Sequence, residues 1–364
     1  MKRSVLRLLA LMLCLSALFL AVSCGGYKPV TSSKEERREM TALGDYTVRY
    51  ELLRAFLHAF RGDYDGGDDA VWSSADADTL FAALKADAMA QIAEIYATFA
   101  VCERYGIDPW GDRVDDLVDK RVTADIDGGI IDGVEVNGYG SKKKYLAALG
   151  EMHLNDSVNR LLHRWDICSS LLYDKVVTNF NDGTNAVTRE EVETFYYSEE
   201  CAQISWLFIS ESTLGLYDEV GAEAFISNAY GKLYESRADY ERMKDIIAAY
   251  TYNLSYDQIE NGFCISRFGG FDRDARRLAE AAFSLGDLEI SGRITTEDGV
   301  YYLVGLAKSQ QYLADAEHYE AVYDLCLANR LYGEIDAAAA ALLDGAEYTD
   351  AYAVLTPMTE LIGR

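Results

Sequence analysis

Apolar residues recur at steps of three and four positions through the first half of the chain, which is the period of an amphipathic α-helix. The pattern starts at Tyr46, and Gly106 follows the longest segment as a helix-ending residue. The segments that we predict as helices are residues 46–60, 76–105, 110–124, 142–149 and 157–177. Asp-Gly and Asn-Gly pairs within residues 125–140 predict a loop or a short hairpin. We therefore expect residues 41–185 to form an all-α domain.

The pattern changes after the polar, glycine-containing residues 181–185, which indicate a linker. Thr188 with Glu191 three positions later predicts a capping box that opens a short helix to Tyr197. Apolar content and length predict a buried strand at residues 201–209, a long helical region at 217–252 and a short helix at 274–283. Two more strands, at 290–295 and 300–306, flank a turn at Asp298-Gly299. The order β-α-α-β-β predicts a small α+β domain over residues 186–308, followed by a segment, 309–364, that is helical at 314–343.

The N-terminus has the layout of a secretory signal peptide, with a positive flank, a short apolar run and then small residues. Lys2, Arg3 and Arg7 precede apolar residues 8–22, a run shorter than the about 20 residues that a membrane-spanning helix needs. Ala21-Val22-Ser23-Cys24, followed by two glycines, resembles the lipobox of bacterial lipoproteins, in which the cysteine is acylated. The alternative is an ordinary cleaved signal with an incidental cysteine.

The lipobox resemblance implies that residues 1–23 are a lipoprotein signal peptide and that Cys24 carries the lipid. Acyl chains on Cys24 would hold the protein on the extracytoplasmic side of a membrane, with the lipid bilayer as a partner. Residues 24–40 contain Gly, Ser, Lys, Glu and Arg and are expected to be a solvated tether.

The net charge of the protein limits the classes of partner that it is expected to bind. The chain has 34 Lys and Arg residues against 60 Asp and Glu residues, and removal of residues 1–23 removes three of the cations, which gives a net charge of −29. Such an acidic protein is not expected to bind nucleic acid, since that binding depends on neutralising phosphates. Anionic headgroups should repel it as well, so that the lipid rather than charge must hold it at the membrane.

The sequence contains no motif typical of metal-dependent proteases, serine hydrolases or nucleotide-binding enzymes. The four histidines have no HExxH-like spacing, and no GxSxG, P-loop or GxGxxG occurs. The cysteines after Cys24 contain no CxxC and stand among apolar neighbours, which favours small buried side chains; one or two disulfides remain open. We expect no metal site and no cofactor.

The whole arrangement resembles the SurA- and PrsA-type foldases, which are extracytoplasmic folding factors. The likeness to the helical arm of these foldases lies in residues 44–48 before a helix, in Tyr105-Gly106-Ile107 and in residues 110–118 and 145–150. The resemblance implies an α+β fold in which a mostly helical SurA-like N-terminal arm and a C-terminal helix surround a small domain similar to parvulin-type peptidyl-prolyl isomerases.

Three segments carry the likeness to parvulins, in the family's order and spacing. They are Ala281-Ala282-Phe283-Ser284-Leu285, Glu289-Ile290-Ser291-Gly292 and Asp298-Gly299-Val300-Tyr301-Tyr302-Leu303. Trp206 and Tyr301 stand where the family usually has two histidines, and Leu278 and Asp274 stand where an aromatic residue and a Met are usual. Neither Asp nor Cys occupies residues 252–253, where the family has one of them. The resemblance therefore assigns no catalytic residue and implies a substrate-binding surface at Trp206, Phe208, Phe271, Leu278, Phe283 and Tyr301.

These features favour a folding factor that binds unfolded or nascent exported polypeptides, with an isomerase domain that is inactive or weakly active. Two alternatives remain. An active isomerase with an altered site is one, because rotation about a prolyl bond needs no nucleophile and Tyr301 keeps a hydroxyl. A non-enzymatic adaptor lipoprotein with one specific partner is the other.

Overall fold

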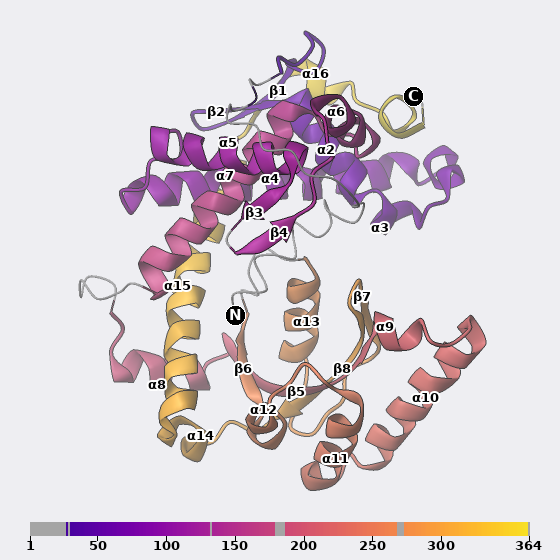
Figure 1. Ribbon diagram of the computed structural model, residues 1–364, viewed down its shortest axis with the longest axis vertical. Coiled ribbons are helices and arrows are strands. Elements are labelled where there is room, and N and C mark those ends of the chain that lie inside the picture. Colours follow the sequence, from indigo (N-terminus) through magenta and orange to yellow (C-terminus); the bar gives the residue numbers. More distant parts are fainter. Residues whose placement is uncertain (1–26, 28–29, 132, 179–185, 268–272, 363–364) are drawn as a thin grey trace. The chain divides into compact units, whose positions relative to one another are not determined.

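The computed structural model describes residues 27, 30–131, 133–178, 186–267 and 273–362, and it has an α+β fold. The chain divides into two compact units. Among the described residues, the helical unit consists of those from Tyr27 to Asp174 together with those from Glu334 to Ile362, and the sheet unit consists of those from Lys175 to Gly333. Helix α15 (Ala316–Asp344) contributes residues to both units (Figure 1). The sheet unit is thus longer at both ends than the domain predicted at residues 186–308.

The helical unit contains a small sheet in addition to its helices, which corrects the expectation of an all-α domain. Strands β1 (Glu39–Leu43) and β2 (Tyr46–Arg49) form an antiparallel hairpin, and β9 (Glu347–Tyr348) pairs with β1. Gly44 in the turn has a φ of +58°, a conformation that glycine adopts most readily. The helix predicted from Tyr46 begins only at Tyr50. Over so few residues, an apolar repeat does not separate a strand from a helix start.

Long helices make up most of this unit, as predicted. They are α2 (Tyr50–Phe60), α4 (Ala77–Arg104), α5 (Asp112–Asp127), α6 (Lys142–Glu151) and α7 (Asp156–Tyr173). Helix α4 packs against α2 and α7 and buries Leu84, Ile92 and Phe99, which recur at the helical period. Gly106, with a φ of +71°, follows its C-terminus as expected. Shorter elements are α3 (Gly62–Asp65), η1 (Asp69–Ser73), β3 (Gly129–Ile131), β4 (Val134–Val136), α16 (Asp350–Ala353) and η4 (Met358–Ile362). Element η2 (Asp174–Thr178) starts at Asp174 and continues into the sheet unit.

Two histidines of the helical unit stack, and their titration should make its stability depend on pH. The rings of His58 and His153 lie 3.5 Å apart between centroids and are nearly parallel. Burial, with repulsion from His153, Arg54 and Arg61, lowers the pKa of His58 to about 4, and burial also lowers that of His153. The folded state therefore favours the neutral rings, while an unfolded histidine titrates near pH 6.5.

The stability that the neutral rings contribute to the helical unit should be fully present above about pH 6.5. It should fall by about 1–2 kcal/mol, after solvent screening, as the pH drops towards 4. The urea midpoint of the helical unit at pH 7.5 and at pH 5 measures this loss. His58→Phe keeps an aromatic ring and removes the proton, so that it should lose at least half of the pH dependence. An equal slope in that variant would assign the effect to other groups.

The sheet unit is organised around one antiparallel sheet of strand order β6-β5-β8-β7. Its strands are β5 (Cys201–Ser210), β6 (Phe263–Ser266), β7 (Ile294–Thr296) and β8 (Gly299–Leu306). The central pair runs from Gln203 opposite Leu306 to Ser210 opposite Gly299. Gly299 has a φ of +146°, and a Cβ there would lie 2.1 Å from the carbonyl oxygen of Ile209. The strands predicted at 201–209 and 300–306 are confirmed, whereas β7 is shorter than predicted.

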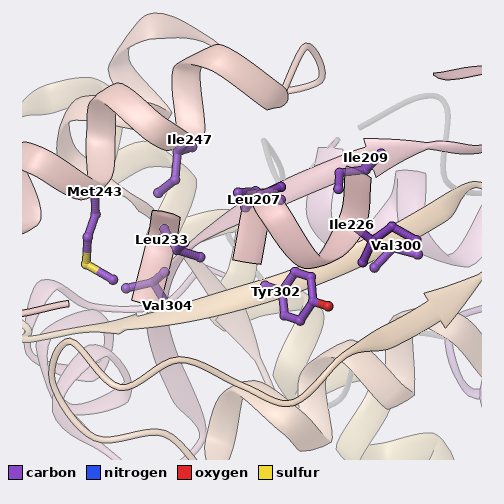
Figure 2. Close-up of a cluster of buried hydrophobic side chains, with 10 residues drawn as sticks. Leu207, Ile209, Ile226, Leu233, Met243, Ile247, Val300, Tyr302 and Val304 are labelled. Carbon is purple, nitrogen blue, oxygen red and sulfur yellow. The ribbon is translucent and has the colours of Figure 1, made fainter. Parts of the chain in front are cut away.

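Strand alternation gives this sheet two apolar faces. One is covered by α10 (Glu219–Glu235) and α11 (Tyr240–Tyr250), which together replace the single helical region predicted at 217–252. Figure 2 shows its core, in which Leu207 and Val304 of the sheet meet Leu233, Met243 and Ile247 of the helices. The other face is covered by α13 (Arg273–Phe283), which lies on the opposite side of the sheet (Figure 1).

The remaining helices of the sheet unit are short, and one confirms a predicted cap. They are α8 (Arg189–Tyr197), α9 (Glu211–Leu214), α12 (Tyr256–Asn261) and α14 (Gln310–Ala314). Thr188 and Glu191 form the expected reciprocal capping box at the start of α8. Across the described ranges, no helix combines the length and the apolar character that a bilayer crossing requires.

Candidate functional site

The candidate site is an aromatic cluster on the α13 face of the sheet. We define the aromatic cluster as Trp206 and Phe208 of β5, Phe263 of β6 and Tyr301 of β8. Trp206 and Phe208 are two positions apart on one strand, and Phe208 lies directly opposite Tyr301, so that the pleat places their side chains on the same face. The site is thus a consequence of strand register.

The rings of the aromatic cluster are in mutual contact. Phe208 and Tyr301 lie 4.4 Å apart between ring centroids, and Trp206 packs edge-on against Phe263 at 4.6 Å and against Tyr301 at 5.3 Å. Edge-on and tilted pairs at these distances are the favourable geometries for aromatic rings. Phe208 and Tyr301 are buried, Trp206 is partly exposed, and Tyr252, whose ring lies 5.7 Å from that of Phe208, is 70% exposed. Part of this aromatic surface is therefore accessible to a ligand.

Residues 251–253, directly after α11, hold the polar groups of the site. The buried Thr251 hydroxyl accepts a hydrogen bond from the Phe208 amide at 2.9 Å and donates to the Trp206 carbonyl oxygen at 3.3 Å. Strand β6 pairs with β5 only as far as Ile204, so Thr251 bonds the β5 backbone beyond the reach of β6. The Asn253 side-chain oxygen accepts a hydrogen bond from the Trp206 indole at 3.2 Å. These bonds fix the position of Trp206 in the cluster.

The structure brings together only some of the residues that the sequence predicted for the site. Leu278, from α13, packs against the same core as Trp206, Phe208 and Tyr301. Phe283 instead lies beside the Arg267 guanidinium, 5.0 Å from its ring centroid, in a shallow hollow that Glu280 and Ser284 also line. Phe271 and Cys24 lie outside the described residues.

Sequence reasoning missed Phe263 and Asn253 as members of the site, and it noted Tyr252 only as one of the aromatic residues near the domain. Phe263 is the first residue of β6, a short strand that the sequence pattern did not predict, so its pairing with β5 could not be anticipated. Tyr252 and Asn253 occupy the position where an acid or a thiol was sought, and neither residue type matched. The available signal was their place at the end of the helical region predicted at residues 217–252.

The aromatic cluster consists of three side chains without a titratable group, Trp206, Phe208 and Phe263, and of the phenol Tyr301. None of its four members is an acid, a thiol or an imidazole. Histidines of the described residues lie elsewhere: His58 and His153 stack, while His163 contacts Asp125 and His318 contacts Asp257. In the ranges that the structure covers, no group of His, Cys, Asp and Glu could hold a metal ion. The arrangement offers apolar rings with an amide and two hydroxyls beside them.

The likeness of this chain to known proteins is a likeness to solved structures. The chain is similar to solved structures of PrsA. The crystal structure of PrsA from Bacillus subtilis shares 12% sequence identity, covers 85% of this chain and 93% of its own, and superposes with a TM-score of 0.25. That of foldase protein PrsA from Streptococcus pneumoniae shares 15%, covers 75% and 88%, and gives 0.28. No protein-family model and no curated protein matches the chain. Because both TM-scores are low, the functional proposal is built on the site itself.

Proposed function

We propose that the protein is an extracytoplasmic folding factor that binds unfolded exported polypeptides on its aromatic cluster and has weak or no prolyl isomerase activity. The observation that supports it best is the partial exposure of Trp206 and the exposure of Tyr252, whose rings contact Tyr301 and Phe208 of the aromatic cluster. None of the four cluster members is an acid, a thiol or an imidazole. Aromatic side chains bury large area at low entropic cost and tolerate varied sequences. Such a surface suits clients that share apolar residues but no motif.

The location belongs to the same proposal. A signal peptide over residues 1–23 and a lipid on Cys24 would place the sheet unit where exported chains emerge unfolded. The net charge of −29 for residues 24–364 supports solubility of the protein while it holds apolar segments.

Client binding tests the proposal. Tyr252→Ala should weaken the binding of a permanently unfolded polypeptide about fivefold or more, since truncation of an aromatic contact residue costs over about 1 kcal/mol. Fluorescence anisotropy of a labelled client, with suppression of its aggregation, measures the effect. Tyr234→Ala is the matched control, because Tyr234 is 46% exposed on α10, which covers the opposite face of the sheet. Equal loss of client affinity in both variants would show that client binding does not depend on the aromatic cluster.

A prolyl-peptide cis/trans assay on the same proteins decides between the alternatives. Tyr301 supports an active isomerase, because it is the one cluster residue with a hydroxyl. A catalysed rate that Tyr301→Phe abolishes would establish that function instead. Absence of both catalysis and client binding would leave the adaptor, which should capture a single stoichiometric partner.

A further inference from the structure

The chain next to the proposed lipid attachment is bound to the helical unit. The Tyr27 carbonyl oxygen accepts a hydrogen bond from Arg160 Nη2 at 2.9 Å, and the Tyr27 hydroxyl donates to Asp127 Oδ1 at 2.9 Å. The Val30 amide donates to Asp156 Oδ2 at 2.8 Å. A segment expected to be a solvated tether is thus docked at these two residues. Since Tyr27 is three residues after Cys24, their Cα atoms lie within about 11 Å of each other.

Three consecutive lysines stand beside this docked segment. We define the lysine patch as Lys142, Lys143 and Lys144, the first residues of α6 and the only run of three cations in the sequence. Lys142 Nζ lies 5.9 Å from the centroid of the Tyr27 ring, and Lys143 and Lys144 are exposed. Cations in the first turn of a helix oppose the helix dipole. Helix stability therefore does not explain the lysine patch.

The acidic groups around the docked segment are largely engaged. Asp127 accepts from Tyr27, and Arg160 contacts both Asp119 and Asp156. Glu135 of β4, seven positions before Lys142 in the sequence, is exposed. The acidic remainder of the protein acts weakly here, because charges beyond about 8–10 Å are screened at physiological salt. The potential close to the lipid attachment is set by nearby charges rather than by the net charge.

We propose that the lysine patch contacts anionic phospholipid headgroups when Cys24 is acylated, and that this contact orients the helical unit on the membrane. The inference rests on the lipid anchor of the proposed function. A short link to the docked segment keeps the lysine patch near the bilayer surface, and lysines near an anionic leaflet each add favourable energy. The acyl chains supply the attachment, and the lysine patch selects which face of the protein meets the membrane.

The test uses the acylated protein, purified from membranes and reconstituted in vesicles of phosphatidylcholine alone or mixed with phosphatidylglycerol. Labelling of Lys143 and Lys144 by an amine reagent should fall about fivefold on the phosphatidylglycerol vesicles and recover in high salt. Lys232, exposed on α10, is the internal control and should label equally on both vesicles. Lys143→Glu with Lys144→Glu should abolish the protection of Lys142. Lys232→Glu with Arg237→Glu, the same charge change elsewhere, should leave the protection of the patch intact.

The outcomes separate the two proposals. An N-terminal peptide without acyl chains would overturn the anchor and, with it, the membrane contact. An acylated protein whose patch lysines label equally on both vesicles would overturn the contact alone. If Lys142 remains protected from labelling in the Lys143→Glu, Lys144→Glu variant, another surface of the protein contacts the membrane.

Discussion

Replacing Phe208 by alanine is expected to unfold the sheet unit under conditions in which the wild-type unit is folded. Phe208 is 2% exposed and packs on Tyr301, its partner across the central strand pair. Truncation of a buried phenylalanine costs about 3–5 kcal/mol, while whole domains are stable by only about 5–15 kcal/mol. The loss removes a large part of the stability of this unit.

Tryptophan fluorescence makes the measurement specific to one unit. Trp206 is in the sheet unit, whereas Trp72, Trp110 and Trp165 are in the helical unit. In a background with those three replaced by Phe, the Trp206 signal should show a much lower urea midpoint for Phe208→Ala. Tyr252→Ala, at an exposed neighbour of Phe208, should change stability by no more than about 0.5 kcal/mol. A midpoint unchanged by Phe208→Ala would show that the cluster does not stabilise the sheet.

Asp156→Ala should destabilise the helical unit by about 3–5 kcal/mol, since it leaves buried partners of a carboxylate unpaired. Asp156 is 2% exposed. Its Oδ1 accepts from the Tyr145 hydroxyl at 3.0 Å, and its Oδ2 accepts from Arg160 Nε at 3.1 Å and from the Val30 amide. The substitution therefore affects the α6–α7 packing and the docked N-terminal segment together.

Urea unfolding of the helical unit, followed in a Trp206→Phe background, measures this loss. Asp119→Ala is the control, because Asp119 contacts the same Arg160 from an exposed position and should cost less than about 1 kcal/mol. Release of the docked segment should also speed tryptic cleavage after Lys34 in Asp156→Ala. Equal effects of the two aspartates would contradict a special role for the buried network.

Local signals in the sequence determined many elements of this protein. The capping box at Thr188 and Glu191, the turn at Gly299 and the apolar run of β5 depend on neighbours within a few residues, and the structure confirms each. The α+β class followed from the same local patterns. Helix α4 likewise follows from its repeat and its terminal glycine.

Tertiary structure decided what depends on partners distant in the chain. Strand β1 pairs with β9 across some 300 residues, and no local pattern specifies that partner. The aromatic cluster exists because the register of β5 places Phe208 opposite Tyr301 of β8 and brings Trp206 near Phe263 of β6. Phe283 lies in a separate hollow. The docking of Tyr27 and Val30 depends on Arg160 and Asp156, more than a hundred residues away. Hydrophobic period fixes which face of an element is buried, but only packing selects its partner.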